Sequence, residues 1–125
     1  MNIHESAEDY LEMILVLKRE KGEIHSIDIA REMNFSKPSV SIAMKKLREE
    51  NLITINEHRE IDLTDAGREI AERIYERHVF ISEALMRLGI DEATAVKEAC
   101  RIEHVISQDT FEKLKAAYNR REAEI

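Results

Sequence analysis

The chain has 125 residues and a net charge of −7, and it is 43% hydrophobic and 36% charged with only 3 Gly and 1 Pro. This length allows one core or two small lobes and excludes a large multidomain enzyme. Because glycine and proline are the main turn-forming residues, their small number predicts a helix-rich globular protein. The single cysteine excludes an internal disulfide. A polar N-terminus and the lack of any run of about 18 apolar residues predict no signal peptide and no membrane partner, so we expect a cytoplasmic protein.

Hydrophobic spacing predicts three helices in the first part of the chain. An apolar stripe with a period near four indicates a helix over about 7–21. A short helix is expected over 26–34, with Ser26 as its N-cap. A third helix is expected over 36–51, with Ser36 as its N-cap and a proline in its first turn, where proline is tolerated.

The hydrophobic period then changes to two. The segments 52–55 and 60–64 are rich in β-branched residues and are separated by polar residues, which predicts a β-hairpin. Helical spacing resumes over 64–89, and further helices are expected over 91–107 and 108–119. The sequence therefore predicts a mostly α fold: an N-terminal winged helix-turn-helix with a small β-hairpin wing, followed by an all-helical domain.

The order of helix, short helix, turn, helix and hairpin is typical of proteins that place a helix in the major groove of DNA. The negative net charge weighs against DNA, but residues 36–48 include four basic residues and no acidic one, as phosphate binding requires. The alternatives are a lysine-rich helix that is merely solvated and a winged helix that binds protein. The residues expected to contact DNA are Ser36, Lys37, Pro38, Ser39, Ser41, Lys45, Lys46, Arg48 and Arg59.

The stretch EACRIEH, residues 98–104, places the only cysteine near a glutamate and a histidine. At offsets i, i+3 and i+4, Cys100, Glu103 and His104 would lie on one face of a helix. All three are metal-binding side-chain types. The alternative is a partly buried cysteine beside a solvated pair of glutamate and histidine.

Two other segments carry side chains of the same kind. Asp9 and Glu12 stand at i and i+3 of the first predicted helix, and His78 interrupts the hydrophobic run of the long helix. Taken singly, the two carboxylates fit an exposed helix face, and His78 fits a core or interface histidine. Taken together with the stretch 98–104, they form a set of carboxylate, imidazole and thiolate groups that suits a divalent first-row metal.

Four segments carry a resemblance to a known family: SAEDYLEMI, SIDIAREMNFSKPSVS, LTDAGREIAERIYERH and EACRIEHVIS. They resemble the metal-dependent repressors typified by the diphtheria toxin repressor and the manganese transport regulator, in a short form without the C-terminal barrel-like domain. The resemblance implies a winged-helix DNA-binding domain over 1–70 and a helical metal-binding and dimerisation domain over 71–125, with metal bound between them. The ligands that it implies are Asp9, Glu12, His78, Cys100, Glu103 and His104.

The resemblance implies Mn(II) or Fe(II) as the cofactor, with Co(II) or Zn(II) binding in vitro. The pairing of Asp9 with Glu12 resembles the manganese branch of the family, whereas Cys100 resembles the iron branch. Cellular availability of each metal weighs as much as affinity. Ser82 and Val96 stand where the iron branch has ligands of an ancillary metal site, so no such site is expected.

We therefore expect a metal-activated repressor of manganese or iron uptake genes that has no enzymatic activity and no small-molecule substrate. Its partners would be double-stranded DNA with a palindromic operator and a second copy of the chain, because two recognition helices must lie about one DNA turn apart. The alternatives are a winged-helix regulator of a non-metal signal and a small helical metalloenzyme. The residues expected at the dimer interface are Ile74, Phe80, Ile81, Leu85 and Leu88.

Overall fold

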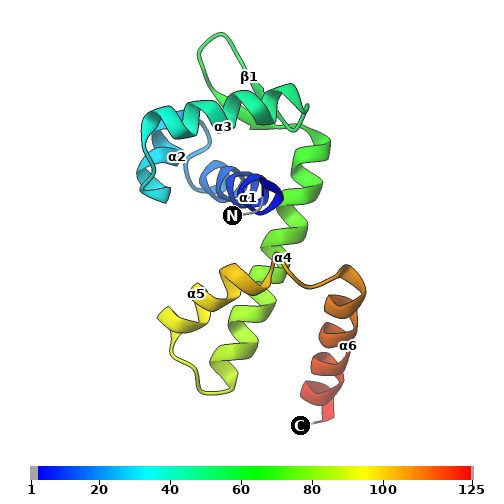
Figure 1. Cartoon of the computed structure of the whole chain (residues 1–125). Helices are drawn as coiled ribbons and strands as arrows, with labels where there is room; N and C mark the ends of the chain where they lie inside the picture. The colour runs from blue at the N-terminus through cyan, green and yellow to red at the C-terminus, as the bar shows by residue number, and fades with distance from the viewer. Residues whose placement is uncertain (1–2, 125) are drawn as a thin grey trace. The chain divides into compact units, whose positions relative to one another are not determined.

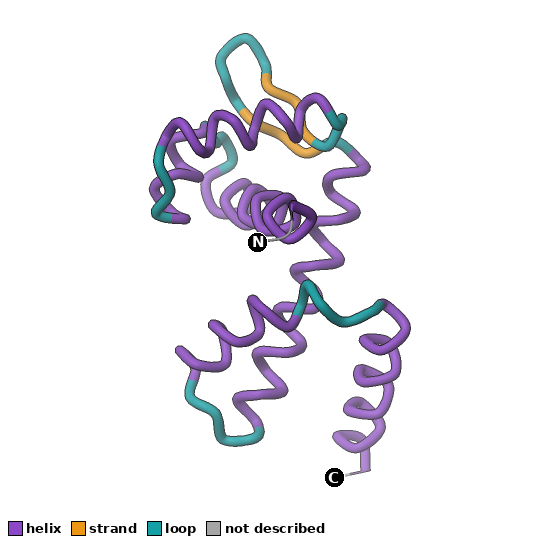
Figure 2. Tube along the Cα trace, viewed as in Figure 1, coloured by secondary structure: helices purple, strands orange, loops and turns teal. Residues whose placement is uncertain are grey.

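The computed structural model describes residues 3–124, and this part of the chain forms six α-helices and one two-stranded antiparallel sheet (Figure 1). The fold is mostly helical, as predicted, and its strands form a single hairpin (Figure 2). Among the described residues, no helix combines the length and the apolar character that crossing a membrane requires. The elements are α1 (Ile3–Lys21), α2 (Ser26–Met33), α3 (Lys37–Glu49), β1 (Ile53–Ile55), β2 (Ile61–Leu63), α4 (Asp65–Arg87), α5 (Glu92–Ile102) and α6 (Gln108–Glu124).

The chain divides into two compact units between Arg73 and Ile74, inside helix α4. The first unit contains α1 to α3, the hairpin and the start of α4, and the second contains the rest of α4 with α5 and α6. The domain boundary predicted after residue 70 falls in the same helix. A single helix therefore belongs to both units.

Helix α1 supplies a large part of the core of the first unit. It begins at Ile3, earlier than the hydrophobic spacing predicted, and ends at Lys21. The backbone N–H of Gly22 then donates to the carbonyl of Lys18 at 2.9 Å, and a φ of +83° at Gly22 allows the chain to leave the helix. The buried residues of α1 are Tyr10, Leu11, Ile14, Leu15 and Leu17.

Helices α2 and α3 form the helix-turn-helix. The N-cap of α2 is His25 and not Ser26 as predicted, because the His25 backbone N–H donates to Asp28 Oδ2 at 2.8 Å. That hydrogen bond lowers the pKa of Asp28. The N-cap of α3 is Ser36, as predicted, and its hydroxyl oxygen accepts a hydrogen bond from the backbone N–H of Ser39 at 3.3 Å.

The hairpin is joined to the helical core of the first unit along one strand. Ile53 pairs with Leu63 and Ile55 with Ile61 in an antiparallel register, which turns Ile53, Ile61 and Leu63 toward the interior. The backbone N–H of Ile61 donates to the carbonyl of Ile24 at 2.9 Å, just before α2. The wing is therefore fixed at its base to the helix-turn-helix.

The second unit has a small aromatic centre. The Phe80 ring packs edge-on against Phe111 and Tyr118, with ring centroids 5.5 and 5.3 Å apart. Helix α5 ends at Ile102, so the helix predicted over 91–107 is too long, and Glu103 and His104 lie in the turn that follows. Helix α6 instead extends beyond its predicted end, to Glu124.

Candidate metal centre and DNA-binding surface

Three potential ligands from different elements of the second unit meet around one imidazole. His78 lies on α4, Cys100 lies near the end of α5, and Glu103 follows the last residue of α5. Glu103 Oε2 is 2.9 Å from His78 Nδ1, and Cys100 Sγ is 3.8 Å from the same nitrogen. The ligand atoms of the three residues all lie within 4.8 Å of one another, which is close enough for one ion.

The electrostatics of this cluster favour a cation. The Glu103 residue has no exposed surface, and its Oε1 has no hydrogen-bond partner among the described residues. A buried carboxylate is costly without a compensating charge. The neighbouring Cys100 and Glu103 side chains raise the pKa of His78 to about 10. In the metal-free protein the imidazole therefore keeps its proton at neutral pH and supplies the positive charge.

The donor atoms fit a divalent first-row metal. An imidazole nitrogen, a thiol sulfur and a carboxylate oxygen form the mixed set that Fe(II), Co(II) or Zn(II) accepts, whereas Mn(II) prefers oxygen ligands. Glu103 Oε1, which accepts no hydrogen bond among the described residues, is an acceptor that such an ion would satisfy. When bound, the ion would supply positive charge to a buried carboxylate.

His104 lies beside this cluster but takes no part in its three-residue group. Its Nε2 is 3.5 Å from Glu103 Oε1, and only 1% of its side chain is exposed. Because α5 ends at Ile102, His104 is placed by the turn and not by the helical i, i+4 spacing from Cys100 that the sequence predicted. His104 therefore lies next to Glu103 because of the turn after α5, and not because both residues lie on one face of a helix.

The two carboxylates predicted on α1 belong to the first unit. Asp9 and Glu12 are both half-buried, and as residues i and i+3 of one helix they share a face. The joining of Asp9 and Glu12 to the candidate ligands of the second unit remains a prediction.

A residue that sequence reasoning missed fixes the backbone of the turn after α5. Arg77 is only 6% exposed, and its guanidinium donates to the carbonyls of Glu103 at 3.0 Å and Ile106 at 2.8 Å. It also donates to Gln108 Oε1 at 2.9 Å. The signal in the sequence was a charged residue inside an apolar helical stripe, directly before His78. Arg77 therefore positions the turn that carries Glu103 and His104.

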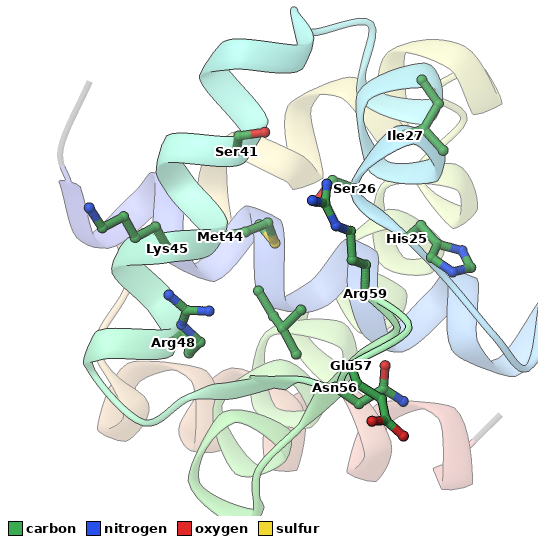
Figure 3. Close-up of a pocket in the computed structure, with 11 residues that line it drawn as sticks. His25, Ser26, Ile27, Ser41, Met44, Lys45, Arg48, Asn56, Glu57 and Arg59 are labelled. Atoms are coloured by element: carbon green, nitrogen blue, oxygen red, sulfur yellow. The ribbon is translucent and has the colours of Figure 1, made fainter.

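The predicted DNA-contacting side chains lie on the surface of the first unit. All eight predicted residues between 36 and 48 are exposed, and so is Arg59. An open groove of about 730 Å³ lies between α3 and the wing (Figure 3). Ser41, Lys45 and Arg48 line it from α3, and Arg59 lines it from the wing. The groove thus combines basic and small polar side chains.

Asn56 organises the tip of the wing. Its Oδ1 accepts hydrogen bonds from the backbone N–H groups of His58 and Glu60, both at 2.9 Å. The backbone carbonyl of Asn56 accepts a hydrogen bond from the backbone N–H of Arg59 at 3.0 Å. Arg59 has a φ of 61°, a left-handed conformation that is uncommon for a residue other than glycine. The wing therefore holds Arg59 in a defined turn, which the sequence did not reveal.

The predicted dimer stripe is only partly exposed in the single chain. Ile74 is 0% exposed and Ile81 is 7% exposed, so both pack within the chain, whereas Leu88 is 79% exposed. Phe80 and Leu85 are half-buried and line an apolar cavity of about 210 Å³ in the second unit. The part of the stripe that a second copy could contact is therefore Phe80, Leu85 and Leu88.

A winged helix-turn-helix joined to a helical unit with a carboxylate, imidazole and thiol cluster defines a class of protein: a metal-responsive DNA-binding regulator. The family models match both parts of the chain. Residues 2–61 match the N-terminal DNA-binding domain of iron-dependent repressors, and residues 64–123 match their metal-binding and dimerisation domain. The chain belongs to the family of iron-dependent repressors.

The most similar sequences include transcriptional regulators from archaea and bacteria. An HTH-type transcriptional regulator of Methanocaldococcus jannaschii is 36% identical over 113 residues, which cover 89% of this chain and 90% of that protein. The transcriptional regulator MntR of Escherichia coli is 33% identical over 108 residues, which cover 86% of this chain and 70% of that protein. These relatives are regulators and not enzymes.

Solved structures agree with this fold. The structure of the manganese regulator SloR has a TM-score of 0.81 at 32% identity and matches 90% of this chain and 53% of that chain. IdeR of T. acidophilum has a TM-score of 0.79 at 27% identity, with the same coverage of 90% and 53%. The chain spans about half the length of these solved relatives.

Proposed function

We propose that the chain is a metal-activated repressor of manganese or iron uptake genes that binds palindromic operators as a dimer, in the cytoplasm. One observation carries the proposal: His78, Cys100 and Glu103 meet within 4.8 Å, and an oxygen of the buried Glu103 has no hydrogen-bond partner among the described residues. This cluster lies in the part of the chain that matches the metal-binding and dimerisation domain.

We further propose that the metal joins the two units of the chain. Asp9 and Glu12 come from α1, which belongs to the first unit, and His78 comes from the second unit together with the ligands of the 98–104 stretch. Ligands from both units on one ion would hold the recognition helix at a fixed angle to the dimerisation surface. Neutralised carboxylates would also repel DNA phosphates less. The complete proposed ligand set is Asp9, Glu12, His78, Cys100, Glu103 and His104.

The identity of the metal depends on Cys100. The five carboxylate and imidazole groups of this set would by themselves favour Mn(II), whereas a thiolate ligand raises the relative affinity for Fe(II), Co(II) or Zn(II). We propose Mn(II) or Fe(II) as the physiological activator, with Co(II) or Zn(II) as substitutes in vitro. Among the similar structures, SloR is described as a manganese regulator and ScaR is described with bound zinc or cadmium.

DNA would be contacted by the exposed face of α3 and by the wing. Helix α3, the recognition helix, would contact DNA phosphates through Lys37, Lys45, Lys46 and Arg48. Arg59 of the wing would contact the DNA backbone beyond the part that α3 contacts. The serines near the N-terminus of α3 would approach base edges. The open groove between α3 and the wing supports this arrangement, because basic residues line it from both sides.

The test uses an operator selected from random duplexes by the metal-loaded protein. We expect affinity for this operator to rise with Mn(II) or Fe(II), and Glu103→Gln to abolish the rise while leaving binding to random DNA in place. Glu98→Gln is the matched control, because Glu98 is an exposed glutamate of α5. Elemental analysis of the purified protein identifies the bound metal. Operator affinity that is the same with and without metal would instead support a regulator of a non-metal signal.

A further inference from the structure

Helix α3 carries a large apolar side chain on the side that points away from the core. Ile42 is 71% exposed, whereas Val40, Met44 and Leu47 of the same helix are buried. With 3.6 residues per turn, position 42 lies almost opposite the line through 40, 44 and 47. Single exposed apolar residues are common, so exposure alone assigns no role. The residues around Ile42 indicate whether it has a functional role.

The residues around Ile42 on this face are typical of a surface that binds a polyanion. Pro38 stands one turn before it, and Lys45 and Lys46 stand one turn after it. All three are exposed. No acidic residue lies in the first turn of α3, and the small side chains nearby allow a partner to come close to the helix. An apolar contact inside a basic surface fits a partner that has a charged backbone and an apolar group within it.

We infer that Ile42 is a specificity-determining residue that contacts the 5-methyl group of a thymine in the major groove. The inference rests on the proposed DNA binding through α3. Isoleucine offers no hydrogen bond, and thymine is the one base that presents a methyl group to the major groove. The branched Ile42 side chain also has few χ1 rotamers, so little conformational entropy is lost when it is fixed against a base.

Deoxyuridine provides a test that removes only the methyl group. In the operator selected by the metal-loaded wild type, each thymine is replaced singly by deoxyuridine, and the dissociation constant is measured by fluorescence anisotropy. We expect one thymine in each half-site at which the replacement weakens binding about fourfold, the effect of one buried methyl group. In Ile42→Ala, replacement at that position should have no further effect, because the two changes remove the same contact.

Two controls separate this contact from loss of folding or of charge. Ile42→Ala should keep the unfolding temperature, the affinity for random DNA and its salt dependence, because an exposed side chain without charge is removed. Val96→Ala, which truncates an exposed apolar residue of α5, should keep the wild-type response to every deoxyuridine. In Ile42→Gln, the selected base at the sensitive position should change from thymine to adenine, because glutamine hydrogen-bonds adenine in the major groove.

The outcomes distinguish this inference from the proposed function. A wild-type protein that selects an operator but shows no sensitive thymine contradicts the role of Ile42 alone. The same holds if Ile42→Ala retains the full fourfold effect, because another group must then contact the methyl. A wild-type protein that selects no operator in the presence of metal contradicts the proposed function, and this inference with it.

Discussion

The carboxylate of Glu103 is buried between two histidines, His78 and His104, and it forms a hydrogen bond with His78. His78 contacts Oε2 at 2.9 Å, whereas Oε1 has no hydrogen-bond partner among the described residues. The Arg77 guanidinium donates its hydrogen bonds to backbone carbonyls and to Gln108. In the metal-free state, the proton on His78 thus takes the place of a cation. Metal binding and proton release should therefore be linked.

Cys100 gives the most direct test of the ligand set, because it is the only thiol of the chain. A thiolate that binds metal is no longer a free nucleophile, so alkylation of Cys100 should slow when Mn(II) or Fe(II) is added. Cys100→Ala should weaken activation by every metal, and Cys100→Glu should shift preference toward Mn(II). Alkylation followed by mass spectrometry measures the rate. Equal rates with and without metal would exclude the ligand role.

The raised pKa of His78 predicts how the metal-free protein responds to pH. Folding holds the proton on His78 up to a pH of about 10, whereas an ordinary histidine loses it near 6.5. The contribution of His78 to the free energy of unfolding is therefore complete below pH 6.5 and decreases as pH rises toward 10. Denaturant unfolding without metal, from pH 6 to 9.5, should show this decrease.

The variant His78→Gln should remove that part of the pH dependence. His58→Gln is the matched control, because the side chain of His58 is 71% exposed on the wing. A wild-type slope that survives in His78→Gln would show that another group titrates. The groups that face His78 are Cys100 and Glu103.

At the scale of the elements, α3 and the wing are placed by a few close contacts at the base of the hairpin. The carbonyl of Leu52 accepts a hydrogen bond from the backbone N–H of Thr64 at 3.1 Å, and the first turn of α4 lies directly over it. Gly67 makes this approach possible, because a Cβ there would lie 2.0 Å from the Leu52 carbonyl oxygen. The wing and α4 can pack this closely only because residue 67 has no side chain.

The substitution Gly67→Ala should therefore destabilise the first unit. The added methyl group meets backbone, which cannot rotate away, so we expect a loss of about 1–3 kcal/mol in the free energy of unfolding. Ala66→Ser at the exposed neighbouring position is the control and should change stability little. Thermal or urea unfolding measures both. An unchanged stability in Gly67→Ala would contradict the close packing of α4 against the hairpin.

The basic face of α3 predicts a loss of affinity that does not depend on DNA sequence. Lys45 and Lys46 are exposed, and each would neutralise one phosphate. Lys45→Ala or Lys46→Ala should weaken binding to operator and random DNA about equally and reduce the slope of log K against log salt by about 0.9. Lys97→Ala, an exposed lysine of α5, is the control. Unchanged slopes in both α3 variants would contradict this docking.

At the scale of the whole molecule, the small second unit leaves apolar surface without a partner in the chain. Leu88 is 79% exposed, and the cavity near Phe80 and Leu85 is lined almost entirely by apolar side chains. Most soluble oligomers are symmetric dimers that use the same patch on both copies. A dimer built on the end of α4 would also carry two recognition helices, as a palindromic operator requires.

We therefore expect a dimer at micromolar concentration in sedimentation experiments. Leu85→Asp combined with Leu88→Asp should shift the protein toward monomer, because each buried charge in an apolar interface is costly. Operator binding should weaken more than binding to random DNA, since one recognition helix reads only half a site. Val96→Asp is the control outside this surface. A wild-type monomer would contradict the assignment of α4 to the interface.

Local sequence patterns determined most of the fold. The apolar period of α1, the N-cap at Ser36, the alternation of the hairpin and the acid-free stretch on α3 are signals carried by residues close together in the chain. The same is true of the spacing of Cys100, Glu103 and His104, which predicted a metal-binding segment. Such signals reflect backbone geometry and hydrophobic burial within one element. They do not fix where an element meets another.

Tertiary structure decided the features that depend on distant contacts. It ends α5 at Ile102 and brings His78 to within 2.9 Å of Glu103, and it places Arg77 where its guanidinium holds the turn after α5. It also buried Ile74 and left Ile42 exposed, although both are isoleucines at helical positions. A periodic pattern identifies an apolar face but not what covers it, because burial and the pKa of a side chain depend on groups supplied by other elements.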